Sequence, residues 1–155
     1  MKGSIVLAAA LAVTPLFVHA KDDRLVARGR YLVEIGGCND CHTPGYAPSG
    51  GKVPESAWLV GDRLGWHGPW GTTYPANLRL LFQDLTEDQW VKKAKTMVTR
   101  PPMPWFDVRA MSTADLKALY RYVRQLGRAG EPAPKALGPG ETPPQPYVDF
   151  PAPPK

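Results

Sequence analysis

Residues 38–42 of the chain read CNDCH, and this stretch contains both of its cysteines. A C-x-x-C-H run is typical of covalent c-type haem attachment. Two thiols at this spacing can each add to one vinyl group of a single haem, and the adjacent imidazole then lies under the iron. The motif therefore predicts that Cys38 and Cys41 bind one haem c and that His42 is the proximal ligand of an iron that cycles between Fe2+ and Fe3+.

Three other uses of the cysteine pair fit the sequence less well. A thioredoxin-like redox pair needs C-x-x-C at a strand-to-helix junction of a βαβ unit, whereas the residues before Cys38 have a helical pattern. A structural zinc site needs four ligands, but after removal of residues 1–20 only His67 remains as a further histidine. A disulfide between residues three apart would leave His42 without a role.

The composition is that of one modest domain. The length of 155 residues corresponds to a single unit, and 43% hydrophobic with 21% charged residues excludes a highly charged disordered chain. The formal net charge is only +5 and no nucleic-acid-binding motif accompanies it, so no nucleic-acid partner is expected. The 18 prolines and 15 glycines indicate that part of the chain lies outside packed helices.

Residues 1–20 have the layout of a cleaved secretory signal. Lys2 precedes an apolar run over residues 5–18, and a polar KDD segment follows Ala20. The run is shorter than the roughly 20 residues that a membrane-spanning helix needs. The sequence therefore predicts export to the periplasm, cleavage after about Ala20 and no integral membrane anchor.

Three segments have helical patterns. Apolar residues recur at helical spacing over residues 24–35, which two glycines end, and over residues 87–98, which follow a T-x-x-Q capping box. The last segment has the clearest periodicity; Ser112 caps its start and Gly127 marks its end. These patterns predict three helices.

Met103 is the best candidate for the distal iron ligand. It lies in RPPMPW, residues 100–105, where three prolines prevent helix and favour a stiff, extended loop. A thioether opposite histidine raises the reduction potential of a haem, which suits an electron carrier. Met97 belongs to a helical apolar stripe and Met111 precedes a helix cap, so both fit structural roles better. His67 is the rival distal ligand.

Together these motifs resemble the class I c-type cytochromes, and more closely the small bacterial monohaem domains related to cytochrome subunits of dehydrogenases. The resemblance covers roughly residues 22–128. It implies an all-α cytochrome c fold of three to four helices around one haem, formed by residues 21–130, with electron transfer as its task. The resembling stretches are residues 28–32, 37–43, 74–78, 101–105 and 115–123.

The resemblance also implies contacts around the haem. In this family the first and last helices cross, which makes Gly29 and Tyr31 one half of the crossing and Tyr120 the partner of Gly29. A proline carbonyl accepts the Nδ1 hydrogen of the proximal histidine, a role for which Pro54 is the first candidate and Pro44 and Pro48 are rivals. Five side chains could supply donors or positive charge to the haem propionates: Trp66, Trp70, Tyr74, Asn77 and Arg79. The alternative is that the aromatic residues pack in the core and that Arg79 is solvated.

The carboxy-terminal tail, residues 131–155, holds 9 of the prolines and has no helix or strand period. Such a composition is typical of polyproline-type or disordered chain. Residues 146–151 carry two aromatic side chains and a valine, which favour the alternative that the tail packs on the domain surface or docks a redox partner.

The expected function is that of a periplasmic single-electron carrier. Histidine and methionine on the two sides of the iron leave no open position for a substrate, so the chain is not expected to be an enzyme. One alternative is a haem sensor or small-gas-binding protein in which Met103 is labile. Another is a dedicated electron-accepting cytochrome subunit of a periplasmic dehydrogenase complex. The expected partners are redox proteins: a dehydrogenase, an oxidase or another cytochrome.

Overall fold

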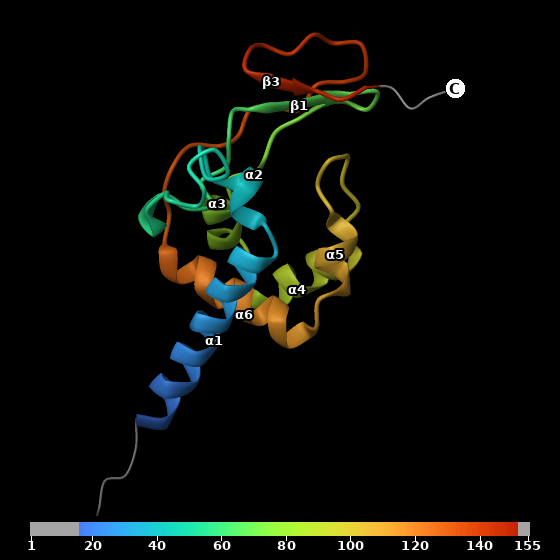
Figure 1. Cartoon of the computed structure of the whole chain (residues 1–155). Helices are drawn as coiled ribbons and strands as arrows, with labels where there is room; N and C mark the ends of the chain where they lie inside the picture. The colour runs from blue at the N-terminus through green and yellow to red at the C-terminus, as the bar shows by residue number, and fades with distance from the viewer. Residues whose placement is uncertain (1–15, 152–155) are drawn as a thin grey trace, which may run out of the picture.

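The computed structural model describes residues 16–151 of the chain, and within them six α-helices form most of the structure (Figure 1). The predicted signal segment lies mostly outside the described residues. No helix in residues 16–151 combines the length and the apolar character needed to cross a membrane. The helices are α1 (Leu16–Ile35), α2 (Cys38–His42), α3 (Leu78–Gln83), α4 (Glu87–Thr96), α5 (Trp105–Ala110) and α6 (Thr113–Leu126), with a short 3-10 turn, η1 (Glu55–Ala57).

The predicted starts of α4 and α6 are present, whereas α1 begins at Leu16 rather than at residue 24. Thr86 accepts a hydrogen bond from the Gln89 backbone at the start of α4, and the Gln89 side chain accepts from the Thr86 backbone, which completes the capping box. Ser112 caps α6 by accepting from the Asp115 backbone, and Gly127 ends that helix at φ 74°. Local sequence signals therefore set the limits of the two long helices of the carboxy-terminal half.

Helices α1 and α6 cross at Gly29. A Cβ atom on this residue would lie 2.1 Å from the Ala118 carbonyl oxygen and 2.6 Å from Tyr122 Cβ, so only glycine allows this approach. The prediction that Tyr120 is the partner of Gly29 is wrong. The tyrosine at the crossing is Tyr122, two positions further along α6. The Tyr120 ring instead stacks on Phe82, with 6.1 Å between the ring centroids. The contact face of α6 is the one shared by residues 118 and 122, four apart.

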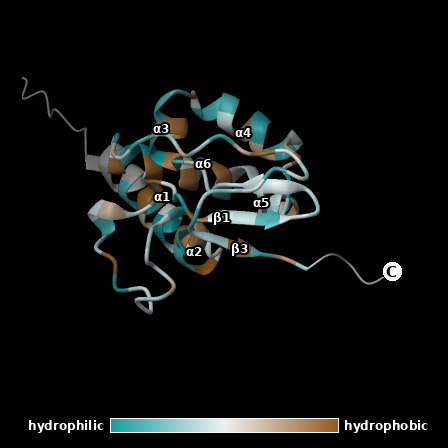
Figure 2. Ribbon diagram, turned by 90° about the horizontal axis from the view of Figure 1, so that it is seen from above, coloured by the Kyte–Doolittle hydropathy of each residue, from teal (hydrophilic) through white to brown (hydrophobic). Residues whose placement is uncertain are grey.

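Tyr31 does not take part in the crossing. Its side chain is 48% exposed and lies beneath the Arg28 guanidinium, 5.3 Å from the ring centroid. The core forms instead from buried apolar residues on α1, α3, α4 and α6, together with the Trp58–Leu59 segment (Figure 2). They are Leu32, Val33, Trp58, Leu59, Phe82, Trp90, Ala94, Leu116, Ala118, Leu119, Tyr122 and Val123.

A small sheet corrects the all-α expectation. The described chain is mostly helical but includes β1 (Gly65–Gly68), β2 (Gly71–Thr73) and β3 (Tyr147–Asp149) in the order β2-β1-β3. β1 and β2 form an antiparallel hairpin, whereas β3 pairs with β1 in parallel. Strands of three or four residues, half of them glycine or threonine, have no visible period of two, which is why the sequence pattern missed them.

The proline-rich tail lies against this hairpin. Leu137 and Thr72 exchange two backbone hydrogen bonds, of 2.9 and 3.2 Å. The Phe150 ring contacts the rings of Trp66 and Trp70, at centroid distances of 5.9 and 5.5 Å, and its backbone N–H donates to the carbonyl of residue 67. Of the two alternatives for the tail, the structure has the packed one for the described residues.

Candidate functional site

Helix α2 consists of the C-x-x-C-H motif itself. Gly37, at φ 63°, separates it from α1 and turns the chain sharply. Cys38 and Cys41 are free thiols, each partly buried. Burial raises the pKa of the Cys38 thiol to about 11 and raises that of Cys41 as well, so both sulfurs are protonated near neutral pH.

His42 is buried, with 8% of its surface exposed, and its Nδ1 lies 2.7 Å from the Ala76 carbonyl oxygen. Burial lowers the pKa of His42, and the hydrogen bond to Ala76 offsets part of that effect. The imidazole is therefore neutral near pH 7. Since a carbonyl only accepts, Nδ1 carries the proton and Nε2 presents a lone pair, which is the form that binds a metal.

Ala76 takes the place that was expected for Pro54. The Pro54 carbonyl instead accepts from the Ala57 backbone at 2.9 Å, at the start of η1. The acceptor is the backbone carbonyl of an alanine. Because any residue has such a carbonyl, the side chain at position 76 gives no sign of this role in the sequence.

The Ala76 carbonyl is positioned by a close approach of two backbone segments. Gly61 adopts φ 80°, and a Cβ there would lie 2.8 Å from the Asn77 nitrogen and 2.9 Å from the Pro75 oxygen. The Gly61 N–H donates to the His42 carbonyl at 2.9 Å, so the same glycine contacts both partners of the imidazole bond. The orientation of His42 thus depends on main-chain contacts that hold residues 42, 61 and 76 together.

Two buried polar side chains tie α2 to the loop that follows it. Thr43 Oγ1 donates to Asn39 Oδ1 at 2.7 Å and accepts from the Leu59 backbone at 2.8 Å. Both Asn39 and Thr43 are 1% exposed. Sequence reasoning missed these residues; Asn39 is an x position of the motif and Thr43 directly follows it, so polar residues in and beside a site motif are the signal that could have found this network.

Met103 lies in the loop between α4 and α5 and is partly buried. Its carbonyl accepts from the Trp105 backbone at 2.9 Å. Figure 1 places this loop and α2 on the same side of the helices, the side that faces the β1–β2 hairpin. Met97 and Met111 are instead the residues at which α4 and α5 end.

The rival ligand, His67, belongs to the sheet. Its Nδ1 lies 2.8 Å from Thr72 Oγ1 across the hairpin. Its ring contacts that of Tyr147 edge-on at 5.8 Å. These contacts account for the histidine as part of the packing between β1, β2 and β3.

The side chains of Arg79 and Asn77 form hydrogen bonds with backbone groups of the protein. Arg79 is buried; its Nε donates to Gly127 O and its Nη1 to Ser56 O, both at 2.7 Å, and its Nη2 donates to Leu126 O. Asn77 accepts from the Leu80 backbone and donates to the carbonyls of residues 129 and 131. These bonds occupy donors of both side chains within the protein, and the burial of Arg79 shows that the solvated alternative for it is wrong. The propionate contacts of both residues stay predictions.

The two tryptophans of the hairpin keep free donors. The indole Nε1 atoms of Trp66 and Trp70 are buried, and the described residues offer them no hydrogen-bond partner. An unpartnered buried N–H costs about 1–3 kcal/mol, so such groups call for an acceptor. A haem propionate is an acceptor of the right chemistry, and these orphaned donors fit the group that the motif implies.

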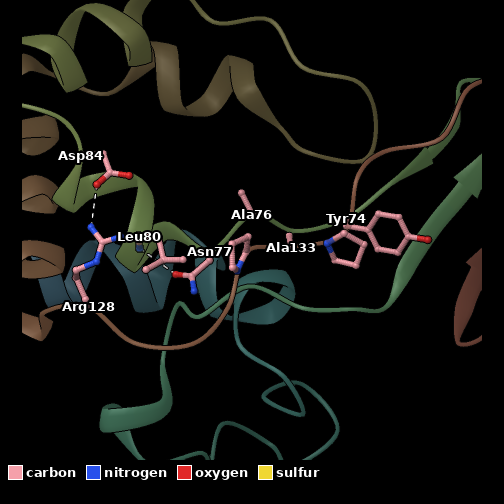
Figure 3. A pocket seen from close by; sticks show the side chains of 9 residues that line it. Tyr74, Ala76, Asn77, Leu80, Asp84, Arg128 and Ala133 are labelled. Carbon is pink, nitrogen blue, oxygen red and sulfur yellow. Dashed lines mark hydrogen bonds and ion pairs between the residues drawn. The ribbon is translucent and has the colours of Figure 1, made fainter.

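Tyr74 lines a groove of about 470 Å³ beside Ala76 (Figure 3). Asn77 and Leu80 contribute to its floor, and an ion pair of 2.8 Å between Arg128 and Asp84 lies at one end. Neither the motif nor Met103 is among the lining residues. The groove therefore adjoins the histidine acceptor without containing a predicted iron ligand.

With this geometry in place, the chain proves similar to cytochrome subunits of dehydrogenases, a similarity that supports a cytochrome c family. It is 31% identical over 126 residues to the fructose dehydrogenase cytochrome subunit of Gluconobacter japonicus, a match covering 75% of this chain and 25% of that protein. It is 30% identical over 112 residues to the gluconate 2-dehydrogenase cytochrome c subunit of Pantoea cypripedii, covering 65% and 23% respectively.

The chain spans about a quarter of the length of these relatives. No protein-family model matches it, and no solved structure matches it significantly.

Proposed function

We propose that the chain is a haem c electron-transfer protein that accepts single electrons from a dehydrogenase. One observation carries the proposal: the C-x-x-C-H motif forms a helix of its own, and its buried His42 is fixed through Nδ1 to Ala76 at 2.7 Å. That hydrogen bond leaves Nε2 as the ligating atom. The two free thiols of the same helix would hold the porphyrin covalently.

The residues present fit such a group. The imidazole is neutral, the thiols are unpaired, and two buried indole donors lack an acceptor within the described chain. When bound, haem supplies an iron that exchanges one electron between Fe2+ and Fe3+. The chain binds and orients it, and the buried core beside α2 limits the access of water, which helps to set the potential.

Met103 is the proposed distal ligand. Its loop faces the same side of the fold as α2, and prolines at 101, 102 and 104 limit its conformations. A loop that is already stiff loses little entropy when one side chain is held in place. Thioether ligation would raise the potential and close the iron to other ligands.

The relatives support a dehydrogenase as the electron donor, because both bear the name of a cytochrome subunit of such an enzyme. We propose a sugar or sugar-acid dehydrogenase, acting in the periplasm after export of this chain. A dehydrogenase removes two electrons from each substrate molecule, so each turnover would require two such carriers, or two successive reductions of one carrier. The chain itself would carry out no substrate chemistry.

Two measurements test the ligand set. The oxidised holoprotein should show the near-infrared sulfur-to-iron charge-transfer band; Met103→Ala should abolish it, and Met97→Ala and His67→Ala should keep it. Reduced protein should bind carbon monoxide slowly and incompletely at neutral pH. Rapid, complete binding would favour the gas-binding alternative, and loss of the band only in His67→Ala would contradict ligation by Met103.

A third measurement tests the donor. Oxidised holoprotein is mixed with a fructose or gluconate dehydrogenase catalytic subunit, with and without its substrate, and haem reduction is followed by absorbance. Reduction that needs both enzyme and substrate supports the proposal. No reduction by either enzyme would remove the support that the relatives give to this donor class.

A further inference from the structure

Arg100, which immediately precedes the prolines of the Met103 loop, ties that loop to two distant segments. Its Nη1 donates to the Trp70 carbonyl at 3.0 Å and to the Leu137 carbonyl at 2.7 Å. Trp70 lies in the turn between β1 and β2, and Leu137 belongs to the proline-rich tail. A charged donor forms stronger hydrogen bonds than a neutral one, so a single side chain links loop, hairpin and tail.

A second bond holds the same end of the loop. Thr73 Oγ1, on β2, donates to the Pro101 carbonyl at 2.8 Å. The two residues before Pro102 are therefore both attached to the hairpin. Because prolines restrict the next positions, fixing residues 100 and 101 also limits where Met103 lies.

The tail supplies one of these attachment points, and it is itself firmly docked. We call residues 137–150 the C-terminal strap. Gly71 adopts φ 93°, and a Cβ on it would lie 2.3 Å from the Leu137 oxygen, the atom that accepts from Arg100. The two backbone bonds between Leu137 and Thr72 fix that carbonyl, and pairing of β3 with β1 holds the other end of the strap.

We propose that Arg100 is a positioning residue for Met103 and that the C-terminal strap provides one of its two acceptors. This inference rests on the proposed ligation of the iron by Met103. Arg100 would act through the loop: its bonds to the Trp70 and Leu137 carbonyls restrict the loop, and so the position of the thioether. Without it, the loop leaves the iron open for a larger fraction of the time, and an external ligand competes more successfully.

The test measures imidazole binding to the ferric, full-length holoprotein. Arg100→Ala should bind imidazole about tenfold more tightly than the original protein, because a lost charge-assisted hydrogen-bond pair weakens loop closure by about that factor. Arg100→Lys, which keeps a donor, should recover part of the difference. The matched control is Arg128→Ala, an exposed arginine whose partner is Asp84, and it should leave the affinity unchanged.

A second pair of variants gives an independent reading if Arg100→Ala yields no holoprotein. Thr73→Val removes the bond to Pro101, whereas Thr99→Val makes the same change at an exposed position of the same loop. Thr73→Val should tighten imidazole binding about threefold, and Thr99→Val should not change it. The inference would be overturned if imidazole bound equally tightly to Arg100→Ala and Arg128→Ala or, where Arg100→Ala yields no holoprotein, to Thr73→Val and Thr99→Val.

Failure of the inference can be told from failure of the proposed function. If the charge-transfer band is missing from the original protein or survives Met103→Ala, methionine ligation itself is wrong. If the band depends on Met103 while Arg100→Ala and Arg128→Ala bind imidazole equally, only the positioning role is wrong.

Discussion

The helical part of the molecule and its hairpin with the C-terminal strap are stabilised in different ways. Among the described residues, every buried apolar side chain of the core lies in a helix or in the Trp58–Leu59 segment, and none lies in a strand. The sheet is held by backbone pairing and a few aromatic contacts. Since the motif belongs to the helical part and the Met103 loop is attached to the hairpin, the two proposed iron ligands are held by different parts of the molecule. Stability and ligand geometry should therefore be separable by mutation.

The largest effect is expected at the helix crossing, from Gly29→Ala. Alanine raises helix propensity by about 1 kcal/mol, which alone would stabilise α1. The new Cβ, however, would overlap the Ala118 carbonyl and the Tyr122 side chain. Overpacking usually costs about 1–3 kcal/mol and occasionally more, and a clash with a main-chain oxygen belongs to the upper end of that range. After the gain in propensity, the free energy of unfolding should fall by about 2 kcal/mol or more in chemical denaturation.

The control for this variant is Ala27→Val, which adds methyl groups at an exposed position of the same helix. It should change stability by less than about 0.5 kcal/mol. A Gly29→Ala protein as stable as the original would mean that α1 and α6 do not cross as closely as described.

The next effect concerns Arg79, which ties α3 to the end of α6 and to the η1 turn within the helical part. Arg79→Met keeps much of the side-chain volume but removes donors to the carbonyls of residues 56, 126 and 127. Partly buried carbonyls without partners should lower stability by about 2 kcal/mol. Arg79→Lys should recover only part of this loss, because a single ammonium cannot reproduce the planar fork. Full recovery in thermal unfolding would contradict the three-carbonyl arrangement.

A smaller effect is expected in the hairpin, from Phe150→Ala. This change removes the ring contacts with Trp66 and Trp70 and should cost about 1–2 kcal/mol, less than a fully buried phenylalanine. Phe106→Ala serves as the control, since that ring is 59% exposed. If the strap is docked as described, proteolysis of residues 137–150 should accelerate in Phe150→Ala alone. Equal rates in the two variants would argue against docking through this ring.

The smallest effect concerns the pH dependence of the α4–α6 contact. Burial alone would raise the pKa of Glu87, but hydrogen bonds from Arg121 and Lys117 outweigh it and lower the pKa below the ordinary 4.5. A carboxylate with a depressed pKa stabilises the fold above its unfolded pKa, and this contribution disappears as the pH falls through the folded value. Glu87→Gln should thus lose about 0.5–1 kcal/mol at pH 7.

The difference between Glu87→Gln and the original protein should shrink as the pH falls below 4.5. Asp84→Asn, which breaks an ion pair exposed on both sides, is the matched control and should change stability less. A Glu87→Gln deficit that stays constant down to pH 3 would show that charge is not its cause.

The three longest helices were predictable, whereas the short helices α3 and α5 and the sheet were not, for a physical reason. Caps at Thr86 and Ser112 and the apolar period of α6 are local signals, readable within a few residues. Pairing of residues 65–67 with 147–149 joins segments some 80 residues apart, and nothing within either segment specifies the other. The site also combines local and distant signals. The C-x-x-C-H motif is recognisable within five residues, whereas the Ala76 acceptor and the roles of Arg79 and Asn77 depend on backbone groups distant in sequence.

The central claim is that Cys38, Cys41 and His42 hold one covalent haem. The most direct measurement is a pyridine haemochrome spectrum with intact mass, on protein produced with a cytochrome c maturation system. We expect one haem per chain, which is retained after denaturation and is lost from the doubly substituted Cys38→Ala, Cys41→Ala protein. Chains that mature without covalent haem, with both thiols still reactive, would contradict it.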